Sequence, residues 1–130
     1  MNKINKMEEE IKKIVNNIIT ELGVGYSESI YHEAICVEFR EKGIRYTKEK
    51  NIEIKYNNIG VGFMRIDIYL EDYKTIIEVK SIAKMNENQE NQLKAYLSNT
   101  EAEDGYLINF NKVSEIIYIN KKTKETRKLF

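Results

Sequence analysis

Two apolar segments separated by a short polar turn, residues 59–70 and 74–80, constrain the fold of this chain more than any other feature. Side chains in a strand alternate between the two faces of a sheet, and so short a turn joins its two strands as antiparallel neighbours. Three charged residues, Asp67, Glu78 and Lys80, interrupt these otherwise apolar strands. The fold and function of this hairpin have to account for three charged residues at positions where core residues are expected.

The spacing of the three charges predicts that they lie close together. Glu78 and Lys80 share one face because they are two residues apart, and the turn can place Asp67 across from Glu78, ~5 Å away if directly opposed. Two carboxylates about 4 Å apart repel by about 4 kcal/mol at an effective dielectric of about 20. Lys80 is one candidate to relieve this repulsion and a divalent cation is a stronger one, because Asp67, Glu78 and the carbonyl of Val79 offer the oxygen atoms that Mg²⁺ prefers. The alternative is an ordinary ion pair on a solvent-exposed sheet face.

Hydrophobic periodicity predicts three helices along the chain. The first carries an apolar stripe at helical spacing from Ile11 to Leu22. The second begins after a capping Ser27 and runs to about Lys42, and the third covers residues 86–98. The expected core members of the second helix are Ile30, Tyr31, Ala34, Ile35, Val37 and Phe39.

Alternation with a period of two predicts the strands. They are expected at residues 52–56, 59–70, 74–80, 106–110 and 116–119, with a turn at Asn57-Asn58 between the first two. The order of elements is therefore α-α-β-β-β-α-β-β. A strand reached through a crossover helix often pairs in parallel with its predecessor, so the fold class is α/β, a mixed β-sheet flanked by α-helices.

The length of 130 residues predicts a single domain, with a core at about 11–119 and a basic C-terminal tail at 120–130. The last ten residues, KKTKETRKLF, carry five Lys or Arg and one Glu. This tail is interpreted either as a solvated, frayed end or as a basic arm that holds a phosphate backbone.

Charge and cysteine content narrow the classes of function. The 21 basic and 21 acidic residues give a net charge of zero, which disfavours non-specific coating of nucleic acid. No apolar run approaches the 18 residues of a membrane span, so no membrane partner is expected. The N-terminus is too polar for a signal peptide, and the single Cys36 has no disulfide partner, so a reducing, cytoplasmic location is expected.

Two further stretches complete a recognisable pattern. GYSESIYHEAI, residues 25–35, has the form G-x-x-E-x-x-Y-x-x-A-[LI], and QLKAYL, residues 92–97, contains Q-x-x-x-Y. With Asp67 and the E-x-K of residues 78–80 between them, the chain resembles the GxxExxY family of the PD-(D/E)xK nuclease superfamily. The resemblance covers residues 14–110. It departs from the superfamily pattern where Ile66, not proline, precedes the aspartate.

The resemblance implies a restriction-endonuclease-like core with an active site of Asp67, Glu78 and Lys80. Asp67 and Glu78 would bind Mg²⁺ or Mn²⁺, and Glu28 would reach the metal directly or through water. Lys80 would assist the attacking water. The metal-binding residues implied are Asp67, Glu78, Val79 and Glu28.

The downstream motif of the family matches Gln92 and Tyr96, which would orient the lysine or contact DNA, and Tyr31 is a second candidate for contacting DNA. Each of these residues also has a structural interpretation. An acid such as Glu28 is stabilised near a helix N-terminus by the helix dipole, whatever its function. Both tyrosines could be core aromatic residues whose hydroxyl groups find a hydrogen-bond partner, and Gln92 could be an ordinary surface residue of its helix. His32 could bind Mn²⁺ or relay a proton, or it could be an exposed helical histidine with neither role.

The function expected is that of a metal-dependent deoxyribonuclease, with RNA as an alternative substrate. A catalytically silent module that binds nucleic acid or a partner on the same fold is the alternative from another class. A third hypothesis is a nuclease that resolves DNA junctions as a homodimer.

Overall fold

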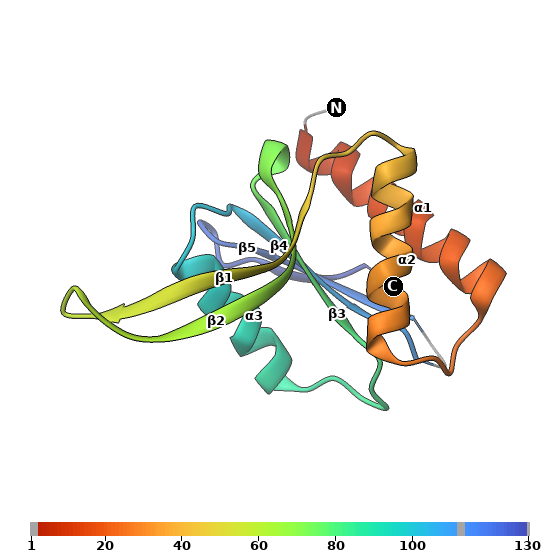
Figure 1. The fold of residues 1–130 in the computed structure, drawn as a ribbon. Helices are drawn as coiled ribbons and strands as arrows, with labels where there is room; N and C mark the ends of the chain where they lie inside the picture. Colours follow the sequence, from red (N-terminus) through yellow and green to blue (C-terminus); the bar gives the residue numbers. More distant parts are fainter. Residues whose placement is uncertain (1–2, 112–113, 130) are drawn as a thin grey trace.

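A six-stranded sheet in the chain order β1-β2-β3-β4-β5-β6 organises the computed structural model, which describes residues 3–111 and 114–129 (Figure 1). The strands are β1 (Thr47–Tyr56), β2 (Ile59–Leu70), β3 (Thr75–Lys80), β4 (Asp104–Asn109), β5 (Glu115–Asn120) and β6 (Thr126–Lys128). The helices are α1 (Lys3–Leu22), α2 (Glu28–Glu41) and α3 (Glu87–Ser98), with a short 3-10 helix, η1 (Glu71–Tyr73), between β2 and β3. The β3–β4 pair is parallel and the other pairs are antiparallel. This confirms the predicted mixed sheet flanked by helices.

Helices cover both faces of the central strands. On one face, a core cluster joins residues of α1 and α2 to Ile68, Ile77 and Val79. On the other face, a second cluster joins Leu93 of α3 to residues that include Ile76. A strand that is covered on both faces has to be apolar at consecutive positions, which explains why β3 has no polar and apolar alternation.

The predicted core of α2 is partly wrong. Tyr31, Ile35 and Phe39 are buried as expected, but Ile30 and Val37 are 44% and 40% exposed. Ile30 and Val37 are seven residues apart and so lie on one side of the helix, away from the stripe that faces the sheet. Ser27 takes the N-cap position, but its hydroxyl lies near Ser29 Oγ and makes no capping bond.

None of the helices in the described ranges is long and apolar enough to cross a membrane.

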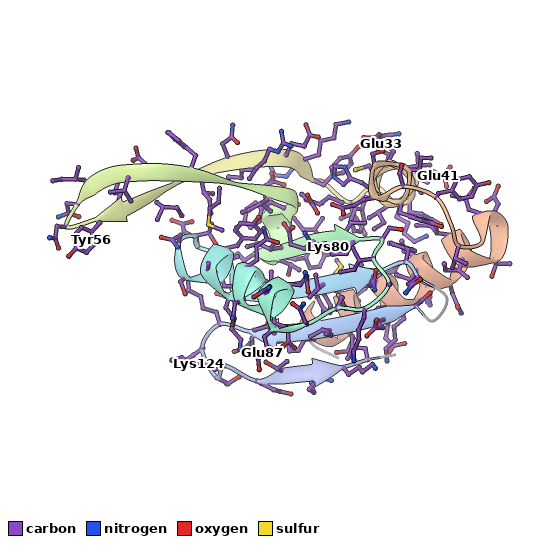
Figure 2. All side chains as sticks on the ribbon, turned by 90° about the horizontal axis from the view of Figure 1, so that it is seen from below. Glu33, Glu41, Tyr56, Lys80, Glu87 and Lys124 are labelled. Atoms are coloured by element: carbon purple, nitrogen blue, oxygen red, sulfur yellow. The ribbon has the colours of Figure 1, made fainter. Side chains whose placement is uncertain are left out.

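The hairpin of β1 and β2 projects beyond the body of the sheet, as Figure 1 shows. Asn57 and Asn58 form its turn with φ values of 51° and 64°, which confirms the turn predicted from these two asparagines. Tyr56 marks the far end of the hairpin in Figure 2. The pairing register shifts at Ile54/Lys55, so a β-bulge separates the last pairs of the hairpin from the rest.

The C-terminal tail forms a strand that the sequence analysis missed. Residues 126–128 pair antiparallel with β5 as β6. Arg127 Nη2 donates a hydrogen bond of 2.9 Å to Glu8 Oε1 of α1, and its guanidinium lies over the ring of Tyr118. The pairing contradicts a frayed end for residues 126–128, whereas the basic arm that holds a phosphate backbone stays a prediction; Phe130 lies outside the described residues.

Substitution of Gly105 by alanine is expected to destabilise the fold. A Cβ on Gly105 would lie 2.7 Å from Cδ1 of Leu93, which is fully buried between α3 and the sheet. Such overpacking typically costs about 1–3 kcal/mol of unfolding free energy, so the midpoint of urea unfolding should fall. Gly62→Ala is the matched control, because a Cβ there meets nothing within 4 Å. Equal midpoints for the two variants would contradict the close packing of α3 on β4.

Candidate active site

The two acids predicted to meet lie where β2 and β3 separate. The backbone ladder between these strands ends at the pair Ile68↔Ile77, one residue short of Asp67 and Glu78. Beyond that point the Asp67 N–H donates to Glu78 Oε1 at 2.9 Å, and the Val79 N–H donates to Asp67 Oδ2 at 2.8 Å. Each carboxyl group therefore takes the place of a ladder bond and is fixed by the backbone of the opposite strand.

The alternation of side chains along β2 is interrupted at Asp67. Strict alternation along β2 would put Ile66, Ile68 and Leu70 on one face, but Ile66 packs in the cluster under α3 while Ile68 and Leu70 pack in the cluster under α1 and α2. Across from Asp67 in β1, Glu49 has a φ of 54°, which is unusual inside a strand. The expectation assumed a regular ladder, whereas side chains separate the strands here.

Among the acids of the site, Glu78 has the pKa that burial shifts most. Its side chain is 2% exposed, and this burial raises its pKa well above the usual range. Repulsion from Asp67 raises the pKa further, while the hydrogen bond from the Asp67 N–H and the charge of Lys80 lower it. The alternative of an ion pair on a solvent-exposed face is therefore wrong for Glu78.

The acid pair suits a divalent cation through its donor chemistry. One oxygen of each carboxyl group accepts a backbone N–H, which leaves the second oxygen of Asp67 and of Glu78 for another ligand. Mg²⁺ and Mn²⁺ are compatible with two carboxylates because such ions keep several waters. Within residues 3–111 and 114–129, no three His, Cys, Asp or Glu side chains converge as a metal site, so Glu28 does not complete the set as it stands.

Glu28 nevertheless lies within electrostatic reach of the acid pair. It is the first residue of α2, and its side chain is exposed at the lining of the cleft beside Asp67. Burial raises its pKa, Asp67 raises it further, and the charges of Lys80 and His32 lower it. The structure thus brings the first residue of α2 to the same site as the last residue of β3.

An open cleft of about 260 Å³ adjoins Asp67. Its lining residues are Glu28, Ser29, His32, Glu49, Arg65 and Asp67. His32 is not the exposed helical residue we considered: it is 9% exposed, and its Nε2 lies 3.1 Å from the carbonyl oxygen of Asp67. Arg65 was missed, although its position two residues before Asp67 on the strand already placed it on the same face.

Helix α3 brings Tyr96 to the acids from the other side. Burial raises the pKa of Tyr96, and the negative charges of Glu78 and Asp67 raise it further, whereas Arg65 lowers it. The hydroxyl group therefore remains protonated near the carboxyl groups, but the side chain is only 3% exposed and offers little surface to DNA. Gln92 lies one helical turn earlier and is half-buried.

Tyr31 has a structural role in place of the predicted DNA contact. It is completely buried, its hydroxyl donates to the carbonyl oxygen of Gly23 at 2.8 Å, and it accepts from the Tyr26 N–H at 3.2 Å. Its ring stacks on Phe110 with centroids 4.4 Å apart. The G-x-x-E-x-x-Y stretch is thus held together by its own tyrosine, which secures the turn before α2.

One of three comparisons with known proteins gives a match. The family model described as the PD-(D/E)XK nuclease superfamily matches residues 5–121, a span that contains the acid pair, Lys80, Glu28 and α3. Neither the curated proteins nor the solved structures give a match.

Proposed function

The chain belongs to the PD-(D/E)XK nuclease superfamily, and from this premise we propose that it is a metal-dependent deoxyribonuclease. The observation that carries the proposal is the fork between β2 and β3, where the carboxyl groups of Asp67 and Glu78 are held side by side by backbone N–H groups. Two acids fixed in this way cost stability unless a cation or a proton lies between them. A module without catalysis would gain nothing from that cost.

In the proposed mechanism the acid pair, with the Val79 carbonyl, would hold Mg²⁺ or Mn²⁺. Such an ion supplies a Lewis acid that lowers the pKa of a bound water and polarises the phosphate. Lys80, at the end of β3, positions the attacking water and stabilises the negative charge that develops on the phosphate. Glu28 orients water at the mouth of the cleft.

Residues around the acids complete the proposed site. Tyr96 stays protonated and can donate a hydrogen bond to an acid or to the substrate phosphate. Gln92, which lies on α3 like Tyr96, orients the Lys80 side chain. His32 supports the backbone of Asp67 through the contact to its carbonyl oxygen. Its place next to this carbonyl gives it a positioning role.

The direct test of the proposed function is cleavage of labelled linear, circular, branched and single-stranded DNA, and of RNA, by the purified protein. We expect cleavage of DNA with Mn²⁺ or Mg²⁺ and none with a chelator. Binding of these substrates without cleavage in any metal would instead support the catalytically silent module.

Binding of the cation is expected to stabilise the protein measurably. A ligand at 100 times its dissociation constant raises the unfolding free energy by about 2.7 kcal/mol, so Mn²⁺ should raise the melting temperature. The shift should disappear in Asp67→Ala, which removes one carboxyl group of the pair. Glu53→Ala is the matched control, because this acid lies on the projecting hairpin and should leave the shift unchanged. A shift that persists in Asp67→Ala would place the cation elsewhere.

A further inference from the structure

Phe63 is an aromatic residue with no structural reason for its position. It lies in β2 within the projecting hairpin and is 73% exposed, more than any other large apolar side chain of the described residues. Its cross-strand partner is Glu53, a charged residue. Isolated apolar residues on a surface are common, but an aromatic ring held out on a two-stranded ribbon contributes little to a core.

The strand places Phe63 on the face of the cleft. Arg65 and Phe63 occupy alternate positions of β2 in the regular stretch before Asp67, and alternate residues of a regular strand point to the same face. The register with β1 stays regular over this stretch, because the bulge lies beyond Phe63, at Ile54/Lys55. Asp67 and Arg65 both line the cleft. Phe63 is four residues from Asp67, about 13 Å along the strand.

The opposite face of the hairpin has a different character. Ile52 is buried in the cluster under α3, and Ile54 and Met64 are partly buried against it. Tyr56 pairs with Ile59 near the turn, and both are exposed. The apolar residues of that face therefore continue the core outward, whereas Phe63 is separate from it.

Charges on the hairpin indicate what kind of ligand would lie along the cleft face. Residues 47–65 carry four basic and two acidic residues in a chain of zero net charge. Lys48 pairs with Glu33, and Lys55 Nζ lies 3.9 Å from Glu53 Oε1. Within the described ranges, the Arg65 side chain makes no hydrogen bond or ion pair. A duplex held by its phosphates needs several free cations, and this face offers one arginine and one aromatic ring.

We propose that the cleft face of the hairpin binds an unpaired nucleic-acid strand, with Phe63 stacking on a base and Arg65 holding a phosphate between that base and the cleft. The inference rests on the proposed nuclease function and specifies its substrate. Unpaired bases expose the faces that stack on aromatic rings, whereas a duplex hides them. The distance of about 13 Å between Phe63 and Asp67 matches about four steps of a stacked strand. Single-stranded, gapped or branched DNA is then the preferred substrate.

Equilibrium binding to a fluorescent single-stranded oligonucleotide, and to the duplex of the same sequence, tests this proposal. Measured by anisotropy in the presence of a chelator, Phe63→Ala should weaken single-strand binding by about 5- to 150-fold. Phe63→Tyr should retain most of the affinity because it keeps an aromatic face, and Phe63→Leu should not. Tyr56→Ala is the matched control, since this aromatic residue is 69% exposed on the opposite face of the same hairpin.

The possible results separate this inference from the proposed function. Metal-dependent cleavage that persists with unchanged single-strand affinity in Phe63→Ala would overturn the docking surface alone. A wild-type dimer that becomes monomeric in Phe63→Ala, with unchanged affinity, would assign the face to contacts between copies and also overturn it. A wild-type protein that neither binds nor cleaves nucleic acid would remove both proposals. Circular dichroism spectra that match the wild type are required of every variant, and all substituted side chains are exposed.

Discussion

Cleavage by the Lys80→Ala variant is expected to fall below detection, while its fold and its affinity for nucleic acid stay close to those of the wild type. Lys80 is half-buried at the end of β3, and its charge lowers the pKa of both Glu28 and Glu78, so it lies within electrostatic reach of the acids. Loss of a positioned group that transfers a proton or stabilises charge typically costs about 10²- to 10⁴-fold in rate. Initial rates of cleavage with Mn²⁺ measure the effect.

Two variants make the Lys80 experiment specific. Lys84→Ala removes an exposed lysine from the loop after β3 and should cleave at the wild-type rate. Lys80→Arg keeps the positive charge but not the compact ammonium group, so it should bind substrate and cleave slowly. Cleavage by Lys80→Ala at the rate of Lys84→Ala would remove Lys80 from the mechanism.

Elements of the sheet were predictable where one physical signal dominated. The hairpin turn followed from two asparagines, which tolerate positive φ, and the parallel pairing of β3 and β4 followed from the intervening helix. Strand β6 was missed because a short, charged sequence has no alternation to reveal it. Its pairing is accompanied by the contact of Arg127 with Glu8, which lies more than a hundred residues earlier.

The candidate site was predictable in its membership more than in its geometry. Strand spacing indicated that Asp67, Glu78 and Lys80 would lie close together, and the family pattern added Glu28. Spacing could not show that the two carboxyl groups replace ladder bonds, because this depends on where the strands separate. For the same reason the burial of His32 against the Asp67 carbonyl was not visible in the helical pattern.

The Glu78→Gln variant is expected to lose cleavage and, with divalent cations chelated, to be more stable than the wild type at neutral pH. Burial and the neighbouring Asp67 raise the pKa of Glu78 in the folded protein. A group of this kind contributes stability that is fully present below its unfolded pKa and is lost as the pH rises through its folded pKa. The amide oxygen of glutamine can still accept from the Asp67 N–H, so the fork between the strands is retained.

Urea unfolding as a function of pH distinguishes this electrostatic effect from a change in packing. Between about pH 4.5, near the ordinary pKa of a glutamate, and neutral pH, the stability of the wild type relative to Glu78→Gln should fall. Each unit by which the folded pKa exceeds its unfolded value corresponds to about 1.4 kcal/mol once the pH is above both. Glu101→Gln, an exposed acid after α3, should follow the wild-type profile. Profiles for wild type and Glu78→Gln that run parallel across this range would show that Glu78 carries no raised pKa. The two buried carboxyl groups would then not repel each other enough to favour a bound cation, and the nuclease proposal depends on that repulsion.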